Sequence, residues 1–217
     1  MRAPPRAELR ERRRALLPRP LVGCAVLGWL LVIGGPPLVS SAAESADESA
    51  VFGELLRLLA ERRHDHVTFT EVQQLAILDR PLHSSGELLY DAPDRLEKRT
   101  LEPRREDLLL EHGMLSIERD HHRRSVALRD FPQAVPLVES LRATLAGDRA
   151  ALARYFTVQF SGTLARWTLE LTPTDATVER SVQHIVITGE TDRIRTVQIR
   201  QSDGDTSTLT IGAEVVP

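Results

Sequence analysis

Alternating apolar and polar residues dominate the last third of the chain. Side chains of a strand point alternately to its two faces, so each alternating run predicts a strand with one apolar face. Five such runs begin at Phe156, Trp167, Ile185, Val197 and Leu209. Asp203-Gly204, between the last two runs, is typical of a tight hairpin.

A second group of strands is predicted upstream, after one helix. Ser45 and Glu48 have the spacing of a capping box, and the apolar stripe that follows predicts a helix ending near Arg62. Alternation starts at His66, and short strands are expected at residues 87–91, 95–101, 106–111, 114–119 and 124–129. Proline and glycine residues punctuate these strands, as a meander requires.

Helical spacing returns between the two groups of strands. Apolar residues recur every four positions in residues 133–146, and Gly147 follows as a C-cap. Asp148 can cap a second short helix that ends at Tyr155.

Together these elements predict a mainly β fold with α-helices (α+β). A single sheet of about 10–11 antiparallel strands should curl rather than stay flat. The helices need the same apolar face of the sheet, which favours an incomplete antiparallel β-barrel with helices covering its concave face. Aliphatic residues occupy most inward positions, so that face is either a filled core or the wall of a lipid-sized cavity.

The first 43 residues differ in composition from the rest of the chain. They carry seven arginines against two glutamates, then an apolar run at residues 21–35, then small residues ending at Ala43. This order is typical of a secretory signal peptide (residues 1–43) cleaved after Ala42 or Ala43; an uncleaved membrane anchor is the alternative. Leu21 to Cys24 match a bacterial lipobox. In a lipobox the apolar run precedes the cysteine, whereas in this chain almost all of the apolar run follows Cys24.

Removing this segment changes the charge of a chain whose total is only −3. Residues 44–217, expected to form one domain, contain 21 basic and 29 acidic residues and no cysteine. The single cysteine, Cys24, excludes a disulfide framework and a zinc site made of several thiolates. An acidic, thiol-free domain suits an oxidising compartment, and the charge gives no indication of a nucleic-acid partner.

The stretch PLHSSGELLYDAPDRL at residues 81–96 resembles a strand signature of Lol-type periplasmic lipoprotein carriers, in which Gly-acidic-Leu leads to a proline. The continuation EKRTLEP at 97–103 and LRATLAGD at 141–148 are similar to a divergent, LolA-related branch. The order of signal, helix, strands, helices and strands matches that family over essentially all of residues 44–217.

This resemblance implies an open barrel, closed by a helical lid, that shelters acyl chains. The expected function is a periplasmic carrier that delivers a lipoprotein, or a related lipid, to the outer membrane. Implied partners are the acylated cargo, an inner-membrane donor and an outer-membrane acceptor, and the carrier itself would be a monomer without a cofactor. The cavity is expected to be lined by Leu88, Tyr90, Leu96, Phe156, Phe160, Trp167, Leu169 and Ile185. The lid is expected to comprise Leu55, Leu58, Leu59, Leu137, Leu141 and Leu145.

One position departs from the family. Well-known members carry an arginine immediately before the strand-ending proline, where it bonds to the lid, and here that position is Ala92. The arginine that bonds to the lid is therefore expected to be absent or moved to another position, with Arg95 as a candidate for a displaced latch. A cargo other than a lipoprotein, such as another lipid, is thus an alternative.

Catalytic motifs are not found in the sequence. It contains no Gly-x-Ser-x-Gly, phosphate loop or His-Glu-x-x-His, so no enzyme activity is expected. His64-Asp65-His66 and His121-His122 are interpreted as solvated residues near turns and not as metal ligands. The alternative to a carrier is a non-catalytic interaction or sensor module built on the same half-barrel.

Overall fold

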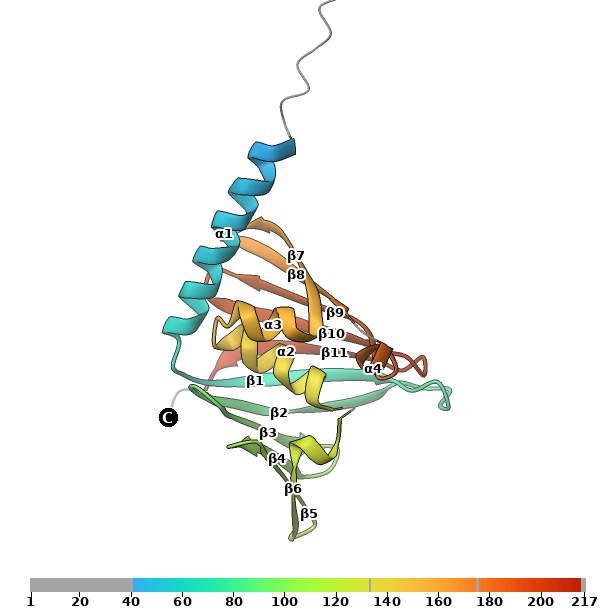
Figure 1. Cartoon of the computed structure of the whole chain (residues 1–217). Helices are drawn as coiled ribbons and strands as arrows, with labels where there is room; N and C mark the ends of the chain where they lie inside the picture. The colour runs from blue at the N-terminus through green and yellow to red at the C-terminus, as the bar shows by residue number, and fades with distance from the viewer. Residues whose placement is uncertain (1–40, 133, 175, 216–217) are drawn as a thin grey trace, which may run out of the picture. The chain divides into compact units, whose positions relative to one another are not determined.

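Eleven antiparallel strands form a single sheet in the described part of the chain (Figure 1). The computed structural model describes residues 41–132, 134–174 and 176–215. The strands are β1 (His64–Gln74), β2 (Leu82–Asp91), β3 (Arg95–Glu102), β4 (Glu106–Glu111), β5 (Met114–Arg119), β6 (His122–Ala127), β7 (Phe156–Thr163), β8 (Arg166–Pro173), β9 (Val182–Glu190), β10 (Arg193–Gln201) and β11 (Thr206–Glu214).

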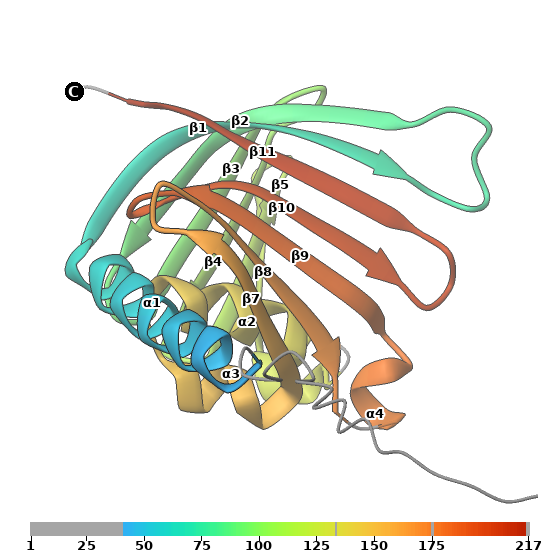
Figure 2. The ribbon, with the colours of Figure 1, turned by 90° about the horizontal axis from the view of Figure 1, so that it is seen from above.

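The sheet is open because its two edge strands do not meet. The order is β6-β5-β4-β3-β2-β1-β11-β10-β9-β8-β7, so β1 lies in the middle and pairs with both β2 and β11. The edge strands β6 and β7 follow each other in the chain, and the helices between them cover the concave side of the sheet. Figure 2 shows this curvature, with α1, α2 and α3 on one side. The helices are α1 (Ser41–Glu61), the 3-10 turn η1 (Leu128–Asp130), α2 (Val135–Leu145), α3 (Arg149–Tyr155) and α4 (Ala176–Glu179).

Gly147 separates α2 from α3 and allows α1 to approach both. Its φ of +64° is left-handed, and its amide donates to the Thr144 carbonyl at 3.1 Å, which completes the C-cap predicted from the sequence. A Cβ at this position would lie 2.2 Å from the Leu56 carbonyl oxygen of α1. The Asp148 side chain then accepts a hydrogen bond from the Ala151 amide at 2.9 Å and starts α3, also as predicted.

The filled core lies on one half of the concave face. Side chains of α1 and α3, together with Ala143 of α2, pack against β7, β8, β9 and β10, and most of them are less than a tenth exposed. Trp167 is its largest member: it is fully buried, and its indole Nε1 donates to the Thr191 carbonyl at 3.0 Å. Gly189 makes room for this ring, because a Cβ there would lie 2.1 Å from the indole. This half of the molecule is therefore tightly packed.

The sequence predicts the fold class and most elements correctly, with differences at some ends. The first helix begins at Ser41, ahead of the predicted capping box, and β2 begins five residues earlier than predicted because it pairs with β1 as far as Leu82. The helix expected at residues 133–146 spans Val135–Leu145, and the strand expected at 124–129 spans His122–Ala127. The short α4 and η1 were not predicted.

The predicted signal peptide lies almost entirely outside the described residues. Ala42 and Ala43, after which cleavage is expected, fall in the first turn of α1, and cleavage itself stays a prediction. Within residues 41–215, apart from the two undescribed positions, no helix combines the length and apolarity needed to cross a membrane.

Candidate functional site

A cavity of about 310 Å³ lies between α2 and the concave face of strands β1 to β5, β10 and β11. That volume is at the lower end of the range of about 300–1,000 Å³ found for small-molecule pockets. Apolar side chains of the sheet, of α2 and of the end of α1 form most of its wall. They are Leu59, Val67, Leu88, Leu89, Tyr90, Leu96, Leu108, Leu110, Leu115, Leu137, Val138, Leu141, Leu145, Ile194, Val197, Ile199, Leu209 and Ile211.

Strand register explains why these residues share one face. Tyr90 pairs with Leu96, which pairs with Leu110, which in turn pairs with Leu115, so one row of cavity residues crosses four strands. Partners directly opposite each other in an antiparallel ladder point to the same side of the sheet. On α2, Leu137, Leu141 and Leu145 recur every four residues and face this row across the cavity.

The residues predicted to line the cavity divide between the two halves of the concave face. Leu88, Tyr90 and Leu96 lie in the cavity wall. Phe156, Trp167, Leu169 and Ile185 lie in the filled core and are at most 1% exposed. Phe160 packs at the edge of that core, where its ring stacks on Phe52 with centroids 5.7 Å apart.

The residues predicted to form the lid divide in the same way. Leu59 on α1 lines the cavity together with the three α2 leucines. Leu55 is fully buried in the core, and Leu58 is half-buried on α1. The helix that faces the cavity is therefore chiefly α2, whereas most of the buried face of α1 belongs to the core.

Tyr90 brings a polar atom into this apolar wall. The residue is 4% exposed, and its hydroxyl is buried without a hydrogen-bond partner among the described residues. Burial is the main cause of a raised pKa of Tyr90, so the hydroxyl stays protonated as a donor.

A charged pair also lies in the cavity wall. The Lys98 ammonium on β3 contacts the Glu71 carboxylate on β1 at 2.5 Å, and Glu71 also accepts from Ser207 at 2.7 Å and from Gln73 at 3.1 Å. Burial alone would raise the pKa of Glu71, but the hydrogen bond and charge of Lys98, with the bonds from Ser207 and Gln73, outweigh it and lower that pKa. Glu71 is therefore a buried, paired carboxylate.

The sequence pattern does not by itself indicate this pair. Lys98 stands in the run EKRT, whose charges suggest a solvated strand. The inward orientation of Lys98 can be predicted from strand alternation: Lys98 lies two residues after Leu96, and residues i and i+2 of a strand share a face. A buried acidic residue at position 71 could also have been found, since it shares the inward parity of Val67 and Phe69 on β1.

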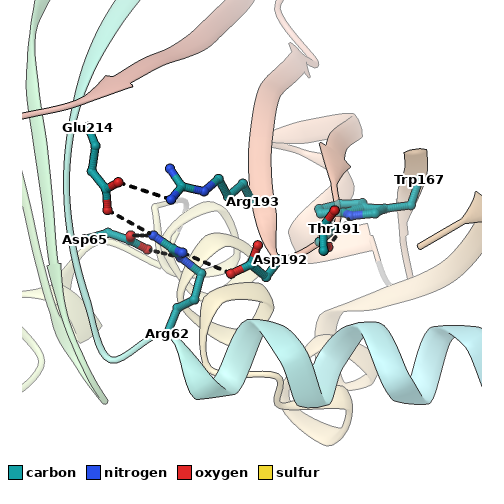
Figure 3. Close-up of polar contacts among 7 residues, drawn as sticks. All are labelled: Arg62, Asp65, Trp167, Thr191, Asp192, Arg193 and Glu214. Atoms are coloured by element: carbon teal, nitrogen blue, oxygen red, sulfur yellow. Dashed lines mark hydrogen bonds and ion pairs between the residues drawn. The ribbon is translucent and has the colours of Figure 1, made fainter. Parts of the chain in front are cut away.

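A second group of charges, here called the Arg62 cluster, comprises Arg62, Asp65, Asp192, Arg193 and Glu214 (Figure 3). Arg62 follows α1 directly and contacts Asp65 on β1, Asp192 in the β9–β10 turn at 3.0 Å, and Glu214 on β11 at 3.6 Å. The hydrogen bond to Asp65 is the main cause of a raised pKa of Arg62, which keeps it charged. Arg62, Asp65, Asp192 and Arg193 also border the cavity. The cluster thus fixes the end of α1 against two strands and the β9–β10 turn at one side of the cavity.

Arg95, the candidate for a displaced latch, has its ion-pair partners on the sheet. It contacts Asp91 at 3.5 Å, Glu97 at 3.0 Å and Glu111 at 3.2 Å, which lie on β2, β3 and β4. The amide of Ala92 donates to the Arg63 carbonyl at 2.8 Å, so backbone joins this position to the α1–β1 junction. In this structure the ion pairs that hold the end of α1 come from Arg62.

The histidines have carboxylate or solvent neighbours. His64 Nδ1 lies 2.8 Å from Asp91, and His66 Nε2 lies 3.0 Å from Glu87. His121 and His122 are exposed at the β5–β6 turn. The described part of the chain contains no group of three or more His, Cys, Asp or Glu placed to hold a metal ion.

Comparison with known families gives one match. The family described as "Outer membrane lipoprotein carrier protein LolA-like" matches residues 41–215, which is most of the chain. No curated protein matches the sequence.

Solved structures with a related fold are distant in sequence. A LolA superfamily protein from Nitrosomonas europaea is 12% identical, with 77% of this chain and 94% of that chain covered and a TM-score of 0.41. A putative outer membrane lipoprotein-sorting protein domain from Vibrio parahaemolyticus is 9% identical, with 75% and 91% covered and a TM-score of 0.42. The lipoprotein LppX from Mycobacterium tuberculosis is 9% identical, with 77% and 97% covered and a TM-score of 0.40.

Proposed function

The chain belongs to the LolA-like family of outer membrane lipoprotein carrier proteins, and from this premise and the apolar cavity we propose that it is a periplasmic carrier of acyl chains. The cargo is an acylated lipoprotein or a related lipid, taken from an inner-membrane donor and delivered to an outer-membrane acceptor. The protein acts as a monomer without a cofactor, after an N-terminal signal peptide has directed its export.

The observation that carries this proposal is the contrast between the two halves of one concave face. On one half, apolar side chains fill the space beneath α1 and α3, and on the other half they surround a cavity beneath α2. Packed interiors rarely contain voids larger than a water molecule. A cavity of about 310 Å³ with a mostly aliphatic wall therefore suits an apolar ligand.

The energetics explain why such a ligand needs a carrier. Each methylene moved from a membrane into water costs about 0.8 kcal/mol, so a chain of about fourteen methylenes costs on the order of 11 kcal/mol. Free diffusion of the lipid through water is excluded by this cost. A cavity wall such as the row from Tyr90 to Leu115 replaces the membrane interior during transfer.

Mass spectrometry of the protein purified without detergent tests this proposal. We expect co-purifying acyl species, and we expect Leu108→Asp to remove them because it places a carboxylate in the cavity wall. Leu109→Asp is the matched control: Leu109 is the next residue of β4, is also half-buried, and points to the opposite face of the sheet. Unchanged acyl content in Leu108→Asp would refute the cavity as the binding site. Absence of acyl species from the wild type, with a stable protein partner, would favour the interaction or sensor module.

A further inference from the structure

Lys98 is the only lysine of the chain; the other 27 basic residues are arginines. It lies on β3 directly opposite Leu88 of β2 and Leu108 of β4, and all three line the cavity. An ammonium thus interrupts a row of aliphatic side chains. A charge in such a setting needs partners, because desolvation of an unpaired ion is costly.

The partners of Lys98 and Glu71 are unequal in number. The Glu71 carboxylate accepts hydrogen bonds from Lys98, Ser207, Ser84 and Gln73, so its two oxygens are well supplied with donors. Lys98 contacts Glu71 and lies 5.1 Å from the centre of the Phe69 ring. An ammonium has three N–H donors, and within the residues that the structure describes only the bond to Glu71 uses one. Lys98 therefore keeps donors for an oxygen atom in the cavity.

The charge around this donor determines which oxygen fits. A fatty-acid carboxylate bound to Lys98 would also face the Glu71 carboxylate, and like charges repel strongly where water is excluded. An uncharged carbonyl oxygen accepts the same hydrogen bond without that repulsion. A hydrogen bond from a charged donor is stronger than one between neutral groups, so a single carbonyl suffices to orient the ligand.

We propose that Lys98, held by Glu71, binds the ester carbonyl of the cargo, so that the cavity selects ester-linked acyl chains over free fatty acids. This inference rests on the proposed function as an acyl carrier and names its ligand class. The same ester chemistry occurs in acylglycerols and in the diacylglyceryl group of a lipoprotein, and the experiment separates these two sources.

Labelling of the single lysine tests the proposal in the full wild-type chain. The protein is treated with a limiting amount of acetic anhydride, and peptide mass spectrometry measures acetylation of Lys98 with the N-terminal amine as internal reference. Three probes of equal acyl length are compared: a monoacylglycerol, a synthetic diacylglyceryl lipopeptide and a free fatty acid. Native mass spectrometry records in parallel whether each probe is bound.

At least one ester probe is expected to slow acetylation of Lys98 about tenfold or more, with the N-terminal amine unaffected. Protection by the lipopeptide alone identifies a lipoprotein cargo, and protection by the monoacylglycerol alone identifies a lipid cargo. An unchanged rate with an ester probe bound would overturn the role of Lys98 and leave the acyl carrier intact. Failure of every probe to bind would instead overturn the proposed function.

A variant pair gives a second test. Lys98→Met combined with Glu71→Gln removes both charges together, so no unpaired ion remains in the wall. The wild type is expected to prefer the ester over the fatty acid by about tenfold, and the double variant is expected to bind the two equally. Arg99→Met is the matched control, because Arg99 follows on the same strand and is not among the cavity residues, and its partner Glu97 keeps a contact with Arg95 at 3.0 Å. A preference that survives in the double variant would refute the proposal.

Discussion

Truncation of one leucine on each half of the concave face should have opposite consequences. Leu169 on β8 is fully buried in the core, whereas Leu88 on β2 is half-buried and borders the cavity. We expect Leu169→Ala to lower stability strongly without changing acyl binding, and Leu88→Ala to lower acyl binding with little change in stability.

The expected magnitudes follow from the two environments. A buried Leu→Ala change creates a new cavity and costs about 2–5 kcal/mol, which applies to Leu169 because its surroundings are closely packed. Leu88 already borders open space, so its truncation loses part of the transfer free energy and creates no separate void. A fully buried methylene contributes about 0.8 kcal/mol, and the Leu88 side chain is only half-buried. We therefore expect Leu88→Ala to lower the free energy of unfolding by about 1 kcal/mol.

Thermal unfolding and mass spectrometry together provide the assay. For a domain of this size, 1 kcal/mol lowers the Tm by about 2–4 °C, so Leu169→Ala should lower it by roughly 4–20 °C and Leu88→Ala by roughly 2–4 °C. Fluorescence of the buried Trp167 reports unfolding of the core. Equal losses of stability would refute the division into a filled and a hollow half. If only Leu169→Ala lost its acyl species, the ligand would bind in the half that we describe as filled, and the assignment of the cavity as the binding site would be wrong.

Three further predictions concern single groups. Gly189→Ala should lower the Tm by several degrees because its Cβ would lie 2.1 Å from the buried indole, whereas Gly53→Ala, with open space around it on α1, should raise stability by about 0.5–1 kcal/mol. Tyr90→Phe should raise the free energy of unfolding by about 1–3 kcal/mol in urea titrations, since it removes an unpaired buried hydroxyl; a loss of stability would reveal a partner for that hydroxyl. The pKa of Glu71 is lowered below its ordinary value of 4.5 in the folded protein, so its carboxylate contributes stability above that pH, and this contribution is lost as the pH falls through the folded pKa. Glu71→Gln should therefore be less stable than the wild type at pH 7, and the difference in unfolding free energy should shrink below about pH 4.5; a constant difference would contradict the ion pair.

The strands could be predicted from the sequence because alternation reports directly which side chains share a face. The runs beginning at Phe156 and Trp167 are strands, and the turn at Gly147 caps the helix that precedes it. Helix boundaries were less accurate. The capping-box spacing at Ser45 suits a helix start, but α1 begins earlier, so local side-chain chemistry alone did not determine its first residue.

Whether an inward residue is core or cavity wall could not be predicted from alternation. Leu169 and Leu88 have the same chemistry and the same inward parity, yet one is fully buried and the other borders the cavity. The difference arises from the helix above each residue, which depends on contacts between distant parts of the chain. Close approaches such as that of Gly86, whose Cβ would lie 1.9 Å from the Arg99 carbonyl oxygen, also depend on the register of the neighbouring strand.

Chain topology explains why one half is filled and the other hollow. α3 leads directly into the edge strand β7 at Phe156, so it must pack close to that edge, where α1 completes the core. α2 arrives from the opposite edge through η1 and is joined to α3 at Gly147, and its leucines face the cavity from above. Movement of α2 about Gly147 would therefore change the cavity, and it would also loosen the contact of Ala143 with the core that contains Trp167. The Arg62 cluster fixes α1 to the sheet beside the cavity, which makes α2, and not α1, the helix expected to move when a ligand enters.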